Sequence, residues 1–121
     1  MATISELLDT NLHEVFAERD GSVRRAVVDR TYTDDVSFAD PEEIVTGRAA
    51  LDAKAAALLG GAPETFVFAS DGPKYVGEGI GALPWAFGPA GAPILHGIDV
   101  ITVRDGLIAT VATFFREGDQ P

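Results

Sequence analysis

The sequence predicts an α+β fold, in which three helices pack on one face of a curved, mostly antiparallel sheet. In the first half of the chain apolar residues recur at helical spacing, whereas the second half consists of apolar runs separated by Gly- and Pro-containing turns. Helices followed by strands are typical of α+β domains. The length of 121 residues suits one domain, which we expect to span residues 1–121 with a tail over 116–121.

We expect helices over residues 3–19, 22–32 and 47–60. Thr3 and Glu6 form a capping box at the start of the first helix, and its apolar residues then follow helical spacing. Ser22 can cap the second helix, and the Gly60-Gly61 pair would end the third.

We expect strands over residues 36–39, 65–70, 75–87, 93–103 and 107–116. Pro41 would end the first strand, and residues 42–46 would form a loop. Pro84 predicts a bulge or a sheet edge within its strand, since proline has no N–H to donate. Asp105-Gly106 is a typical two-residue hairpin turn.

Composition excludes several classes of function. The net charge of −10 disfavours nucleic acid and anionic membranes as partners. The chain has no cysteine, and its two histidines share no ligand spacing, so we expect neither a metal nor a cofactor. No segment reaches the roughly 18 apolar residues of a membrane helix, and residues 1–6 lack the features of a secretory signal. We therefore expect a cytoplasmic protein without membrane contact.

Two aspartates stand in settings that suit proton transfer. Asp40 ends the run Tyr-Thr-Asp-Asp-Val-Ser-Phe-Ala-Asp before Pro41, and Asp99 lies in an apolar run that is typical of a central strand. A buried carboxyl is costly unless it is paired, hydrogen-bonded or neutral. Two structural alternatives stay open: Asp40 as a turn residue before proline, and Asp99 as a hydrogen-bonding group without a chemical role.

Alternation along the strands assigns further candidates to faces. Asp99 and His96 point to opposite faces of their strand, so they do not form a catalytic pair. The strand over 75–87 carries apolar residues that would form one wall of a ligand pocket, namely Leu83, Trp85 and Phe87. The glycines at 77, 79 and 81 on the same face either make room for a ligand or allow close packing.

The element order, the Tyr-x-Asp-Asp-x-x-x-x-Asp-Pro motif followed by Gly47, and the closing Asp-Gly-x-Ile hairpin resemble one superfamily. It comprises nuclear transport factor 2, the SnoaL-like cyclases and the ketosteroid isomerases. The resemblance covers nearly the whole chain. It implies a cone-shaped NTF2-like fold whose curved sheet encloses an apolar pocket and whose opposite face often forms a dimer. This fold hosts isomerases, cyclases, hydrolases, dehydratases and non-catalytic binders.

The resemblance also implies roles for the two aspartates. Asp40 falls where ketosteroid isomerases keep their general base, and Asp99 where they keep a protonated acid that stabilises the enolate oxygen. The first helix lacks the tyrosine that provides their other donor. At that level it has His13, Glu14 and Phe16. Tyr32 resembles a supporting tyrosine of some members.

We therefore expect a cofactor-independent isomerase or dehydratase that acts on a small hydrophobic carbonyl compound. Asp40 would remove a proton beside the carbonyl, and Asp99 would donate to the enolate oxygen. The substrate would contact Tyr32, Phe16, Trp85, Phe87 and Leu83.

Two alternatives remain open. One is a non-catalytic dimer that binds a small molecule, which the missing tyrosine favours. The other is a SnoaL-like polyketide cyclase or hydrolase, which the absence of an acid at residues 109–115 disfavours. In each case we expect a homodimer, because one sheet face carries Ile94, Ile98 and Val100 with no helices to cover them.

Overall fold

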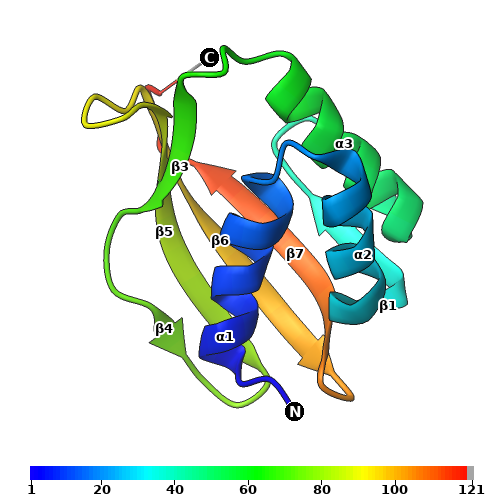
Figure 1. Cartoon of the computed structure of the whole chain (residues 1–121). Helices are drawn as coiled ribbons and strands as arrows, with labels where there is room; N and C mark the ends of the chain where they lie inside the picture. The colour runs from blue at the N-terminus through cyan, green and yellow to red at the C-terminus, as the bar shows by residue number, and fades with distance from the viewer. Residues whose placement is uncertain (120–121) are drawn as a thin grey trace.

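A computed structural model of the chain describes residues 1–119, in which three helices cover one face of a mixed, curved and unclosed seven-stranded sheet (Figure 1). The first helix consists of α1 (Ile4–Asp9) and a π-helical continuation, η1 (Thr10–Phe16); the others are α2 (Gly21–Thr31) and α3 (Arg48–Gly60). The strands are β1 (Tyr32–Ala39), β2 (Ile44–Thr46), β3 (Phe66–Ser70), β4 (Tyr75–Val76), β5 (Ile80–Pro89), β6 (Leu95–Arg104) and β7 (Leu107–Phe115). The α+β prediction is confirmed. Residues 120 and 121 of the predicted tail lie outside the described residues.

The sheet has the order β2-β1-β7-β6-β5-β3, with β4 also paired to β5. β1 runs parallel to β7, and the other pairs are antiparallel. The predicted hairpin joins β6 to β7, where Asp105 and Gly106 adopt positive φ values of 55° and 79°. Figure 1 shows the first helix lying over β5, β6 and β7, with α2 and α3 beside it.

Three local predictions about strands are wrong. β1 begins at Tyr32 instead of residue 36, because an exposed pair of acids, Asp34 and Asp35, hides the strand pattern. Residues 44–46 form the edge strand β2 instead of a loop. The strand expected over residues 75–87 is broken into β4 and β5 where Gly79 turns the backbone with a φ of 71°.

Pro84 causes no bulge in the pairing of β5 with β6. On its other side, the last residue of β3 pairs with Trp85 and the first residue of β4 pairs with Ala82. Pro84 therefore lies opposite the gap between β3 and β4. No strand pairs with β5 at that point, so the missing N–H of proline costs no hydrogen bond there.

The first helix packs closely on the sheet. Its buried residues are Leu7, Leu8, Asn11, Leu12, Val15 and Phe16. Burial of each large apolar side chain contributes about 1.5–3 kcal/mol. A Cβ at Gly81 would lie 2.5 Å from Cγ2 of Ile4, so this glycine serves close helix packing. Among the described residues, no helix is both long and apolar enough to cross a membrane.

A partly buried ion pair joins α2 to α3. Arg24, 4% exposed, donates from Nε to Oδ1 of Asp52 at 2.6 Å and from Nη1 to the carbonyl of Glu18 at 2.7 Å. Since α3 contributes to the pocket described below, this pair helps to hold one pocket wall.

We predict that Arg24→Leu lowers the free energy of unfolding by about 3–5 kcal/mol, because it leaves the Asp52 carboxylate without its buried partner. The matched control is Arg25→Leu. Arg25 lies 4.0 Å from the same aspartate, but its side chain is 62% exposed, so the loss should be below about 1 kcal/mol. Urea denaturation of both variants measures the difference; equal losses would contradict the prediction.

Candidate active site

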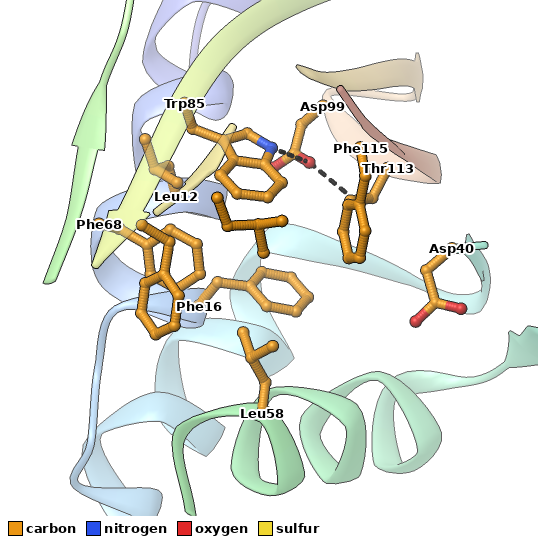
Figure 2. Close-up of a pocket in the computed structure, with 11 residues that line it drawn as sticks. Leu12, Phe16, Asp40, Leu58, Phe68, Trp85, Asp99, Thr113 and Phe115 are labelled. Carbon is orange, nitrogen blue, oxygen red and sulfur yellow. Dashed lines mark hydrogen bonds between the residues drawn. The ribbon is translucent and has the colours of Figure 1, made fainter. Parts of the chain in front are cut away.

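A small pocket with a volume of about 60 Å³ lies between the sheet and the helices, and it opens to the surface (Figure 2). Its lining is contributed by η1, α3 and five strands or strand ends: Leu12, Phe16, Asp40, Leu58, Phe68, Trp85, Phe87, Leu95, Asp99, Thr113 and Phe115. Within the described part of the chain, polar side-chain oxygens reach this lining from Asp40, Asp99 and Thr113. An apolar pocket with few convergent polar groups is typical of a small-molecule site.

The structure brings five of the seven predicted site residues to this lining: Phe16, Asp40, Trp85, Phe87 and Asp99. Leu83 and Tyr32 are buried in the core without lining the pocket. Leu83 pairs with Asp99 across β5 and β6, and Tyr32 contacts Asn11. The roles of all seven residues in binding or catalysis stay predictions.

Asp99 lies within the pocket wall and is only 6% exposed. Its Oδ1 accepts hydrogen bonds from Trp85 Nε1 at 2.9 Å and Thr113 Oγ1 at 2.8 Å (Figure 2). Its Oδ2 accepts one from Asn11 Nδ2 at 3.0 Å. Burial raises the pKa of Asp99 to about 6, although the three hydrogen bonds oppose that rise. This carboxyl therefore exchanges its proton close to neutral pH.

The surroundings of Asp99 determine where its proton can point. The indole of Trp85 and the Asn11 amide nitrogen can only donate, so neither can accept a proton from the carboxyl. Of these three partners, only the Thr113 hydroxyl can reverse its role. Neither Trp85 nor Asn11 therefore competes for a proton carried by Asp99, whose side chain lines the pocket.

Gly97 makes room for the indole of Trp85. The two residues pair across β5 and β6, and a Cβ at Gly97 would lie 2.3 Å from Cζ2 of the indole. The ring also makes edge contacts with Phe68 and Phe115, at centroid distances of 5.6 and 6.0 Å. The missing side chain at position 97 therefore lets the indole N–H reach Asp99.

Asn11 is a site residue that the sequence reasoning missed. It is fully buried in η1, and its Oδ1 accepts a hydrogen bond from the hydroxyl of Tyr32. Burial, with a smaller effect of the nearby Asp99, raises the pKa of Tyr32 well above its usual value, so the phenol stays neutral. A signal was present in the sequence, because Asn11 is a polar residue within the apolar stripe of the first helix.

Asp40 lies at the mouth of the pocket, where the cavity continues outward past Lys54 and Leu58. Its Oδ2 is 2.7 Å from Lys54 Nζ, and its Oδ1 accepts the backbone N–H groups of Glu42 and Glu43. Partial burial alone would raise the pKa of Asp40, but the bonds from Lys54 and these two N–H groups outweigh it and lower the pKa. Figure 2 shows its carboxylate directed towards α3, apart from Asp99.

The predicted separation of Asp99 from His96 is confirmed. β6 alternates, so Asp99 is buried on the helix side while its neighbour Ile98 is 42% exposed. His96 lies 2.6 Å from Asp119 through Nδ1 and does not line the pocket. Among residues 1–119, no group of three His, Asp or Glu side chains is arranged to hold a metal ion.

No model of a known protein family matches the chain, and no curated protein matches its sequence. Solved structures match its fold. A proposed isomerase of the SnoaL-like family from Agrobacterium tumefaciens has 22% identity and a TM-score of 0.83, covering 91% of this chain and 94% of that one. A proposed ketosteroid isomerase from Kribbella flavida has 20% identity and a TM-score of 0.67, covering 97% and 77%.

A third match is a proposed SnoaL-like polyketide cyclase from Jannaschia, with 16% identity, a TM-score of 0.72, and coverage of 90% and 81%. At sequence identities of 16–22%, the structural similarity shows a shared fold and nothing more. The chain thus has the SnoaL-like and nuclear transport factor 2-like fold that its sequence predicts.

We predict that the fluorescence of Trp85 reports the titration of Asp99, because the indole N–H donates to this carboxyl. A pH titration of the wild-type protein should show a transition with a midpoint of about 6, the pKa of Asp99. Asp99→Asn should abolish the transition, since the amide does not titrate.

Gly97→Ala gives a second test of this contact. The new methyl group would lie 2.3 Å from both the indole and the backbone carbonyl oxygen of Phe114. It would therefore displace the indole and the adjoining backbone of β7, and in a folded variant the transition near pH 6 should weaken or disappear. Gly60→Ala is the matched control, because a Cβ at Gly60 meets no atom within 4 Å. A transition that persists unchanged in Asp99→Asn would show that another group causes it.

Proposed function

We propose that the protein is a cofactor-independent enzyme that transfers a proton on a small hydrophobic carbonyl compound. One observation carries the proposal: a pocket lined mainly by apolar side chains holds the buried carboxyl of Asp99, which three donors contact and whose pKa burial raises to about 6. A neutral carboxylic acid donates a strong hydrogen bond to a developing enolate oxygen. An apolar substrate that displaces water would favour the neutral form of Asp99 further, since desolvation is the main cause of its raised pKa.

In the proposed reaction, the carboxylate of Asp40 removes a proton from the carbon beside the carbonyl group. The C–H electron pair forms a C=C bond, and negative charge moves to the oxygen, which accepts the proton of Asp99 in a hydrogen bond. Return of the proton from Asp40 to another carbon completes an isomerisation. Alternatively, the same intermediate loses a hydroxyl group, which takes the proton from Asp40 and leaves as water. This step completes a dehydration.

The interactions of Asp40 are compatible with a base. Lys54 and the two backbone N–H groups occupy three of the roughly four acceptor sites of its carboxylate, which leaves one site on Oδ2. Its lowered pKa keeps it ionised at neutral pH, although a carboxylate of low pKa is a weak base.

The weakness of Asp40 as a base favours a second candidate function, a non-catalytic protein that binds a small hydrophobic molecule in the same pocket. Lys54 would then serve only to close the mouth. Loss of turnover in Asp40→Asn separates the two functions, because a binding protein has no turnover to lose.

We predict that a substituted phenol with a pKa near neutral binds in the pocket as the phenolate, with its oxygen on protonated Asp99. Such a compound imitates an enolate. The absorbance of the bound phenolate measures both affinity and the position of the proton. Asp99→Ala should weaken binding about ten- to a hundredfold, the value of one hydrogen bond to a charged oxygen.

Asp40→Asn is the matched control for this titration. It removes a negative charge from the same pocket, so phenolate should bind at least as tightly as to the wild-type protein. Binding that does not depend on Asp99, or binding as the neutral phenol beside ionised Asp99, would contradict the assigned role of Asp99.

We also propose a homodimer through the sheet face opposite the helices. Ile98 and Phe114 pair across β6 and β7 on this face, and they are 42% and 57% exposed. Phe114→Lys should shift the sedimentation coefficient to that of a monomer, whereas Ile44→Lys at the exposed edge strand should not. A monomeric wild-type protein at micromolar concentration would contradict this proposal.

A further inference from the structure

We propose that Asn11 is a positioning residue, which Tyr32 holds in place and which fixes the carboxyl of Asp99 in the pocket wall. This inference rests on the proposed function, since it assigns Asn11 a part in the same site. Asn11 itself does not line the pocket. It acts through Asp99, whose Oδ2 accepts the Nδ2–H of Asn11 at 3.0 Å.

Tyr32 determines which way the Asn11 amide faces. The neutral phenol donates to Oδ1 of the amide, which turns Nδ2 towards Asp99. While Asp99 is ionised, a flipped amide would place Oδ1 against a carboxylate oxygen, and two acceptors repel each other. The chain of donors therefore runs in one direction, from Tyr32 through Asn11 to Asp99.

The two oxygens of Asp99 have different partners. Oδ1 has two donors, Trp85 and Thr113, whereas Oδ2 accepts from Asn11. Asn11 therefore holds the carboxyl oxygen that neither of the other two donors contacts. A hydrogen bond to the ionised form favours that form, so Asn11 limits how far burial can raise the pKa of Asp99.

Burying the polar side chain of Asn11 in the first helix would cost free energy if it did not hydrogen-bond to Asp99 and Tyr32. It is completely buried among apolar residues of the same helix, such as Leu8, Leu12 and Val15. Polar groups are seldom buried without a hydrogen-bonding purpose. Asn11 also lies in the π-helical stretch η1, in which Ala17 N donates to Leu12 O at 3.0 Å. π-Helical turns are uncommon and occur often at functional sites.

The test is a carboxyl-carbon NMR titration of Asp99 in the full chain. Asn11→Leu keeps a side chain of similar shape but removes the donor to Oδ2. It should raise the pKa of Asp99 by about one unit, the scale expected for one hydrogen bond to a charged group. Tyr32→Phe should produce a smaller rise in the same direction, because the amide stays but loses its fixed orientation.

Two controls accompany these variants. Tyr75→Phe removes a hydroxyl from an exposed tyrosine and should leave the pKa of Asp99 unchanged. The pKa of Asp40 should be the same in every variant, since Asn11 does not contact it. If Asn11→Leu fails to fold, Tyr32→Phe still tests the direction of the shift, because it preserves the aromatic ring.

An Asp99 pKa equal to the wild-type value in folded Asn11→Leu, or in Tyr32→Phe when Asn11→Leu does not fold, would overturn the proposal. The NMR signal reads the carboxyl itself, so a rise supports the positioning role even if no phenol binds. If Asn11→Leu lost phenolate binding while the pKa of Asp99 stayed unchanged, this result would count against the positioning role of Asn11. It would leave the proposed function standing.

Discussion

The burial of one carboxyl, Asp99, is the constraint on which the site depends. An aspartate inside an apolar strand is tolerated only where other groups solvate it. Three elements each contribute one donor to Asp99: the first helix through Asn11, β5 through Trp85 and β7 through Thr113. The close approach at Gly97 belongs to the same arrangement, because the indole reaches Asp99 across that position. Packing and chemistry are therefore coupled at this residue.

The raised pKa of Asp99 determines how its protonation affects the stability of the fold. The folded protein binds the Asp99 proton more tightly than the unfolded chain does. Asp99 therefore favours the folded state below its unfolded pKa, and this contribution, about 3 kcal/mol in size, is lost as the pH rises through about 6. Asp40 behaves in the opposite way: its pKa is lowered, so its contribution is present at neutral pH and is lost in acid. At a pH somewhat below 6, the two carboxyls of one pocket thus differ in charge, because Asp99 is then largely neutral while Asp40 is still ionised.

The sequence predicted the fold and part of the site for a common reason. Periodicity is local, so it identified the helices and the alternation of β6 that buries Asp99 and turns His96 away. The donors to Asp99 could not be predicted in this way, because Asn11 lies 88 residues from it in the chain. Lys54 was missed for the same reason: its contact with Asp40 depends on how α3 crosses the mouth of the pocket.

The most direct test of the account is a crystal structure of the protein with the bound phenol. The phenol oxygen should lie about 2.5–2.7 Å from the Asp99 carboxyl, the length of a hydrogen bond between an O–H group and a charged oxygen. The ring should then contact Trp85 and Phe115 in the interior of the pocket. A ligand whose oxygen instead contacts Lys54 at the mouth, with the Asp99 carboxyl untouched, would contradict the central role given to Asp99.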